Sequence, residues 1–196
     1  YQHGGVKVKS GLAIITQSSN IAMNITMQKR ALPIAMIVTA GNQAQIDLAE
    51  IGTSLLNDKR ITALGVHIEG IKNLSTFEAL AKTALNLGKS IVALKVGKSI
   101  QAQAATISHT ASLTGDDSGA TALFERLGIA RVKSLPIFLE SLKLLHVTGS
   151  LPSNKIASVS CSGGEASLVA DLALEANVIF PNLNKHQKNN LRSALG

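Results

Sequence analysis

The sequence has little cysteine and few aromatic residues. Its 196 residues include one cysteine, Cys161, together with one tyrosine, four phenylalanines and no tryptophan. A single cysteine excludes a disulfide within the chain and favours a reducing compartment, so we expect a cytoplasmic protein. With so few rings, the chain is poorly equipped to stack on nucleic-acid bases or on a flavin.

Long apolar runs and clustered charges are also missing. No stretch approaches the ~20 consecutive apolar residues of a transmembrane helix, and we see no signal peptide, so no membrane association is expected. The net charge is +7, but the basic residues occur as pairs and single residues rather than as a stripe. We therefore expect no nucleic-acid partner and a diffuse positive field that favours nucleotides, phosphate and coenzyme A.

The chain does show a regular alternation of apolar runs and helical patterns. We expect strands at Leu12–Thr16, Ile34–Val38, Ala63–Ile68, Ile91–Val96 and Ile129–Val132. We expect helices at Ile21–Arg30, Asp47–Asn57, Thr76–Leu87, Gly119–Leu127 and Pro136–Thr148. Apolar strands that alternate with helices of about ten residues predict an α/β protein with a doubly wound parallel sheet.

A change of pattern after residue 148 predicts a domain boundary. The first domain is expected to span residues 1–148, with residues 149–155 as a linker. Residues 156–196 would open a second, similar domain. There we expect a strand from Ile156, a helix over Glu165–Asn177, a short strand over Val178–Phe180 and a helix from about Lys185.

Residues 106–115, Thr-Ile-Ser-His-Thr-Ala-Ser-Leu-Thr-Gly, surround His109 with small and hydroxyl-bearing side chains. Such a segment buries little apolar surface and is typical of a surface loop. Imidazole titrates near neutrality and is a nucleophile, so His109 is a candidate for carrying a group between two sites. The local sequence alone favours the alternative, an ordinary solvated loop histidine.

Two turns between a strand and a helix are candidate phosphate sites. The first is Ser18-Ser19-Asn20 and the second is Ser162-Gly163-Gly164. Free N–H groups and the helix dipole both favour an anion at a helix start. Many α/β proteins cap helices in this way without binding a ligand, so each turn alone is weak evidence.

Ser18, Asn42, Glu69 and the 97–115 segment all follow the ends of expected strands. Ligands of open parallel sheets bind beyond the carboxyl ends of the strands, so these residues are expected to converge on one rim. Glu69 could accept the Nδ1 proton of His109 and leave Nε2 free to attack. A glutamate that faces water at a strand end is the alternative.

Several other motifs do not fit a site. Gly88-Lys89-Ser90 and Gly97-Lys98-Ser99 resemble the end of a P-loop, but Thr83 and Val92 occupy the positions that need glycine. No paired cysteine and histidine motif is present, so we expect no metal site within the chain. Cys161 has no obvious base nearby and is expected to be a small buried residue at a strand end.

Six segments together resemble the NDP-forming acyl-CoA synthetases, the relatives of succinyl-CoA synthetase and of ADP-forming acetyl-CoA synthetase. They are ITQSSNIAMNI, TAGNQAQIDLAEI, VHIEGIKN, ALKVGKS, AATISHTASLTGDD and VSCSGGEASLVADLAL, in the order of the family. The resemblance implies a flavodoxin-like domain in which His109 is phosphorylated during turnover and Glu69 orients it. It also implies that helices starting at the two turns grip the phosphohistidine, and that Gly41 and Asn42 bind substrate.

The resemblance further implies the reaction acid + CoA + ATP ⇌ acyl-CoA + ADP + phosphate, through an acyl phosphate. Mg²⁺ would accompany the nucleotide at a site outside this segment. The expected partners are CoA-binding and ATP-grasp domains or subunits of the same synthetase, a small carboxylic acid and further copies in an oligomer. Family members commonly have Ser-Gly-Ala at the first turn and a glycine-rich sequence near Glu165, so the identity of the acid stays open.

Two alternative functions use the same fold. One is a non-catalytic acyl-CoA-sensing regulatory domain of an acyltransferase-type relative; such relatives tend to lack the histidine, so His109 favours the enzyme. The other is a flavodoxin-like module that binds a flavin phosphate, which the scarcity of aromatic residues disfavours.

Overall fold

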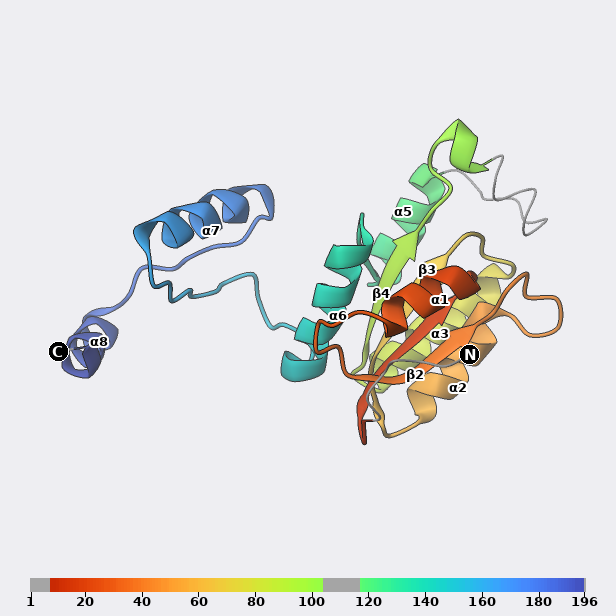
Figure 1. Cartoon of the computed structure of the whole chain (residues 1–196), viewed down its shortest axis with the longest axis horizontal. Coiled ribbons are helices and arrows are strands. Elements are labelled where there is room, and N and C mark those ends of the chain that lie inside the picture. Colours follow the sequence, from red (N-terminus) through yellow and green to blue (C-terminus); the bar gives the residue numbers. More distant parts are fainter. Residues whose placement is uncertain (1–7, 104–116, 196) are drawn as a thin grey trace. The chain divides into compact units, whose positions relative to one another are not determined.

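The computed structural model describes residues 8–103 and 117–195. The chain divides into two compact units, Tyr1–Ser150 and Leu151–Gly196. None of the described helices is long and apolar enough to cross a membrane. The first unit contains the sheet and most of the helices (Figure 1).

The sheet of the first unit has five strands, all parallel, in the order β2-β1-β3-β4-β5. The strands are β1 (Gly11–Thr16), β2 (Ile34–Thr39), β3 (Ile61–Ile68), β4 (Ser90–Lys95) and β5 (Ala130–Arg131). The order is that of flavodoxin-like proteins and confirms the predicted doubly wound parallel sheet. The direction of winding reverses between β1 and β3, which makes this the switch point of the sheet.

Helices cover both faces of the sheet (Figure 1). One face carries α2 (Leu48–Asn57), α3 (Leu74–Asn86) and α5 (Asp117–Arg126), and the other carries α1 (Ser19–Thr26) and α6 (Leu135–Thr148). Because side chains alternate along a strand, Ala13 and Ile15 pack toward α2 and α3, whereas Leu12 and Ile14 pack toward α1 and α6. This explains why β1 is buried over its full length.

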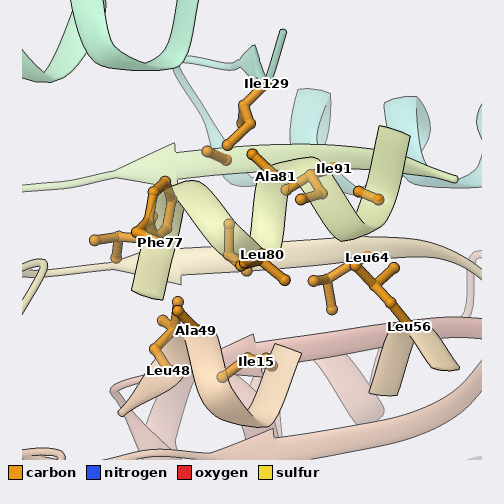
Figure 2. Packing of buried hydrophobic residues seen from close by; sticks show 14 of the residues in the cluster. Ile15, Leu48, Ala49, Leu56, Leu64, Phe77, Leu80, Ala81, Ile91 and Ile129 are labelled. Carbon is orange, nitrogen blue, oxygen red and sulfur yellow. The ribbon is translucent and has the colours of Figure 1, made fainter. Parts of the chain in front are cut away.

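The larger of the two cores lies beneath α2, α3 and α5. Phe77 and Leu80 of α3, Leu56 of α2 and Leu64 of β3 are all fully buried in it (Figure 2). Each such side chain contributes about 1.5–3 kcal/mol when it leaves water. This packing stabilises the sheet and so fixes the positions of the strand ends.

One glycine in the middle of β3 brings the sheet and α6 together. A Cβ at Gly65 would lie 2.6 Å from Phe138 Cζ and 2.6 Å from Leu142 Cδ1. Real Cβ atoms do not approach other atoms so closely, and the side chains of Phe138 and Leu142 are themselves fully buried. Glycine at this position is thus required by packing.

The largest difference from the predicted elements in the first unit concerns α1. The helix begins at Ser19 and ends at Thr26, not at Ile21 and Arg30. Ser18 is the N-cap, since its hydroxyl accepts from the Ile21 N–H at 3.4 Å. After the helix the chain must turn back so that β2 can pair in parallel with β1, and Ala31 in that turn has a positive φ of +50°. A helix that continued to Arg30 would leave only Ala31, Leu32 and Pro33 for the turn.

The second unit contains α7 (Gly163–Glu175) and α8 (Lys185–Leu195). The predicted strands at Ile156 and at Val178–Phe180 are wrong, because Lys155 and Ile179 form only an isolated parallel bridge. A strand needs a ladder of partners, and the described residues of this unit provide none. Val159 is fully exposed, and Cys161 is also exposed rather than buried as expected.

Candidate functional site

Buried polar side chains gather at or just beyond the carboxyl ends of β1, β2, β3 and β4. These are Thr16, Gln17, Gln43, His67 and Lys95, each less than a tenth exposed. Burying polar groups is unfavourable unless they find partners, so a cluster of them marks a part of the protein with a special role. The cluster surrounds the switch point between β1 and β3, where ligands of such sheets bind.

The first predicted phosphate turn lies directly after β1. Ser18 caps α1, and its N–H donates to Thr16 Oγ1 at 3.0 Å. Ser19 and Asn20, expected in the turn, are instead the first two residues of the helix. Their N–H groups have no acceptor among the residues that the structure describes, as is usual for the first turn of a helix. They leave two donors at the positive end of the helix dipole.

Glu69 follows β3 and is tied to the end of β1. Gln17 Oε1 accepts from the Glu69 N–H at 2.5 Å and from the Gly70 N–H at 3.1 Å. Glu69 is half-buried, and within residues 8–103 and 117–195 no donor pairs with its carboxylate. The side chain is available to a further partner.

Gly41 and Asn42 form an exposed turn after β2. Gly41 and Gln43 both have positive φ, +54° and +56°, and Asn42 Oδ1 accepts from the Ala44 N–H at 3.1 Å. The buried Gln43 fastens this turn to the rest of the rim. Its Nε2 donates to the Gly70 carbonyl at 3.3 Å, and its Oε1 accepts from the Leu48 N–H at 2.8 Å.

His67 is buried at the end of β3, directly across from Thr16 in the β1–β3 register. Its Nδ1 lies 3.0 Å from Thr16 Oγ1. Burial lowers the pKa of His67 below that of a free imidazole. The residue therefore favours the neutral form and contacts the hydroxyl that also holds the Ser18 N–H.

A charged cluster lies at the ends of β4 and β5. The Arg131 guanidinium donates to the Asp117 carboxylate and to the Thr121 hydroxyl, and the hydrogen bond from Arg131 lowers the pKa of Asp117. Buried Lys95 donates from Nζ to the Val96 carbonyl at 3.0 Å. Burial lowers the pKa of Lys95, which the Asp117 carboxylate opposes. The ion pair fixes the start of α5, the helix that follows the His109 segment.

His109 belongs to residues 104–116, which lie outside the described residues. The predicted contact between Glu69 and His109 therefore stays a prediction. The structure does describe the Glu69 carboxylate, which has no partner among the described residues, and the ion pair between Arg131 and Asp117 at the start of α5.

The second predicted phosphate turn belongs to the second unit. Ser162 caps α7 by accepting from the Glu165 N–H at 3.2 Å. Gly163 and Gly164 are the first residues of the helix, and Glu165 Oε2 accepts from the Cys161 N–H at 3.2 Å. An anion at this helix start would thus lie near the Glu165 carboxylate, which already accepts from the Cys161 N–H.

Comparison with known families identifies the first unit. Residues 9–145 match the family described as the succinyl-CoA ligase like flavodoxin domain. The chain belongs to this family. The match covers the whole sheet, so the strand-end rim is the rim of a succinyl-CoA ligase-like domain.

Curated relatives include ADP-forming ligases. The acetate–CoA ligase [ADP-forming] of Methanocaldococcus jannaschii is 30% identical over 95% of this chain and 27% of its own length. The acetate–CoA ligase [ADP-forming] II subunit alpha of Pyrococcus furiosus is 30% identical over 97% of this chain and 42% of its own length. The chain thus spans about a quarter to two fifths of these relatives.

Solved structures share the fold. The dinucleotide forming acetyl-coenzyme A synthetase 1 of Ca. Korarchaeum cryptofilum, in complex with phosphate and ADP, superposes with a TM-score of 0.80 at 22% identity. The superposition covers 92% of this chain and 40% of that chain. At this identity the likeness establishes the fold of the succinyl-CoA ligase-like domain.

Sequence reasoning missed much of the buried rim of the succinyl-CoA ligase-like domain. Gln17, Gln43, His67, Lys95 and Arg131 were not among the expected site residues. A signal was present at Thr16-Gln17, where polar residues end an apolar strand, and at His67, a polar residue within the mostly apolar β3. Among the described residues there is no group of three or more histidine, cysteine, aspartate or glutamate side chains that could hold a metal ion.

Proposed function

We propose that the chain is part of an NDP-forming acyl-CoA synthetase that works through an acyl phosphate and a phosphohistidine. The observation that carries the proposal is the hydrogen bond from the Glu69 N–H to Gln17 Oε1, in a domain of this family. This bond links the residue before Ser18 to the backbone of Glu69. The start of α1, with its free N–H groups, thus follows β1, and the Glu69 carboxylate, which has no described partner, follows β3. These two strands are neighbours at the switch point of the sheet.

In the proposed mechanism His109 carries the phosphoryl group. Nε2 of His109 attacks the γ-phosphorus of ATP, the N–P bond forms, and the bond to the leaving oxygen of ADP breaks. Glu69 accepts the Nδ1 proton in a hydrogen bond and stabilises the imidazolium that forms. The N–H groups of Ser19 and Asn20 hold the oxygens of the phosphoryl group. We propose the turn at Ser162, Gly163 and Gly164 as a second phosphate-binding turn.

The second half of the proposed reaction makes the thioester. A carboxylate oxygen of the acid attacks the phosphohistidine phosphorus, the N–P bond breaks, and an acyl phosphate forms. The thiolate of CoA then attacks the acyl carbon and releases phosphate. Gly41 and Asn42 would contact the substrate, with Asn42 Nδ2 as the donor because Oδ1 is used within the turn.

The proposal requires parts beyond this chain. CoA-binding and ATP-grasp domains or subunits would supply the coenzyme and the nucleotide, and Mg²⁺ would neutralise the nucleotide phosphates there. One curated relative is named as an alpha subunit, which supports such an assembly. We further propose a cytoplasmic, oligomeric enzyme that acts on a small carboxylic acid.

Phosphorylation of the histidine tests the proposal. The full-length protein is incubated with ATP labelled in the γ-phosphate and Mg²⁺, and the bound label is tested for the acid lability and base stability of a phosphohistidine. We expect label in the wild type and in His186→Ala, which removes an exposed histidine, and none in His109→Ala. Label that survives His109→Ala would overturn the proposal. A wild type that binds acyl-CoA and takes up no label would favour the non-catalytic sensing domain.

A further inference from the structure

The side chain of Gln17 is the least usual group on the rim. It is only 6% exposed, and its Oε1 accepts two N–H groups, those of Glu69 and Gly70. Its Nε2 is buried and has no hydrogen-bond partner among the described residues. The carboxamide is therefore held through its oxygen alone.

An unpartnered buried donor is unfavourable. A methionine or leucine at residue 17 would avoid that cost, but would leave the Glu69 and Gly70 N–H groups without an acceptor. The β1–β3 ladder ends at the pair Thr16 and His67, so the backbone beyond it cannot supply one. The oxygen of Gln17 extends the contact between the two strands by one more step.

The Glu69–Gly70 segment is held from both sides. Gln17 of the β1 end takes its two N–H groups, and Gln43 of the β2 turn donates to the Gly70 carbonyl at 3.3 Å. A peptide segment with both of its N–H groups and one of its two carbonyl groups engaged has little freedom to rotate. The direction in which Glu69 leaves the backbone is thereby fixed.

We propose that Gln17 is a positioning residue that acts through Glu69, with Oε1 holding the Glu69 backbone in the orientation that the carboxylate needs. This inference rests on the proposed function, in which Glu69 orients His109. The role belongs to the oxygen of the carboxamide, and the Nε2 amide is dispensable. Removing the oxygen displaces Glu69, and displacements of about 1 Å from a reacting group lower rates by about 100-fold.

A double-mutant cycle tests the inference. The rate of phosphohistidine formation is measured by rapid quench in the full-length protein for Gln17→Met, Glu69→Gln and the double variant. We expect Glu69→Gln to lower the rate by about 10²–10⁴-fold and Gln17→Met by about 10- to 100-fold. The double variant should be no slower than Glu69→Gln within about threefold, because the two residues act as one unit. Gln45→Met makes the same chemical change at an exposed site and should leave the rate unchanged.

The outcomes separate the inference from the proposed function. An unchanged rate in Glu69→Gln refutes the proposed role of Glu69 and the inference with it. A slow Glu69→Gln with an unchanged Gln17→Met, or with effects that multiply in the double variant, overturns the inference alone. If Gln17→Met does not fold, as judged by circular dichroism, Gln17→Glu decides. It keeps an accepting oxygen and lacks the amide, so a rate within about tenfold of the wild type supports the inference, and a larger loss overturns it.

Discussion

Thr16 and His67 meet side by side at the ends of β1 and β3, with 3.0 Å between the hydroxyl oxygen and Nδ1. The same hydroxyl oxygen accepts from the Ser18 N–H at 3.0 Å. Thr16 therefore links a buried imidazole to the residue that caps α1. The charge state of His67 bears on the stability of the fold at the place where the proposed phosphate turn begins.

We predict that His67 makes the protein less stable as the pH falls from 7 to 5. Burial lowers its pKa in the folded state, so below about pH 6.5 the unfolded chain binds a proton that the folded chain does not. The free energy of unfolding should decrease by at most about 1.4 kcal/mol per pH unit from this residue. Denaturant titrations at pH 5, 6 and 7 measure it.

The control for this prediction is a second histidine. His67→Asn should flatten the pH dependence between pH 5 and 7, since asparagine keeps a polar atom near the position of Nδ1. His186→Gln removes an exposed imidazole and should keep the dependence of the wild type. An equal slope in wild type and His67→Asn would contradict the prediction.

Gly65→Ala should destabilise the protein by about 1–3 kcal/mol, because the new methyl group would overlap Phe138 and Leu142. Gly119→Ala is the matched control. A Cβ there meets nothing within 4 Å, and alanine within α5 should be neutral or stabilise by up to about 1 kcal/mol. Thermal unfolding of both variants checks the pair, and equal melting temperatures would show that α6 can move away from β3.

Ser19→Pro should weaken phosphate binding by about tenfold, because it removes one free N–H and a hydrogen bond to a charged group contributes about 1.5–3 kcal/mol. Proline suits the first position of a helix, and Ser18 already has the extended backbone that proline needs before it. The measurement is a phosphate titration followed by NMR shifts at low salt, where electrostatic binding is strongest.

Leu74→Pro introduces the same change at the first position of α3 and should leave phosphate affinity unaltered. The isolated 196-residue chain is expected to bind phosphate in this way and yet to show no synthetase activity. Turnover of acid, CoA and ATP by this chain alone would contradict the modular arrangement. Equal affinities in wild type and Ser19→Pro would assign the anion to another place.

Glu165→Gln should strengthen anion binding at the Ser162 turn by up to about fivefold. Two unit charges about 4 Å apart in water repel by about 1 kcal/mol, and the glutamine can still accept from the Cys161 N–H. Glu175→Gln, at the last residue of α7, serves as the control of equal charge. If the two variants bind phosphate alike, the Glu165 carboxylate is not near the anion.

The sheet could be predicted because burial leaves a strong mark on the sequence. β1 and β3 lie inside with both faces covered, and their mostly apolar sequences follow from that. Edges were less predictable. β5 was expected over Ile129–Val132, but only Ala130–Arg131 joins the ladder, because an edge strand is defined by one neighbour and not by its own composition.

The candidate site was also predictable only in part. Ser18, Asn42 and Glu69 could be singled out because each follows a strand end. The hydrogen bonds that join them could not, since Gln17 and Gln43 reach partners chosen by the order of the strands in space. Periodicity tells which residues are buried, but not which strand end lies next to which.

The Gln17–Glu69 bond spans 52 residues of sequence, and β2 and α2 lie within that interval. Closing so long a loop must precede the contact, and long-range strand pairing is the slow part of folding. A nascent chain released up to residue 60 contains the sequence of α1 but lacks β3, and a helix of eight residues is not stable without the sheet on which it packs. During synthesis, phosphate-binding capacity at α1 should therefore arise only after β3 has emerged, together with the geometry around Glu69.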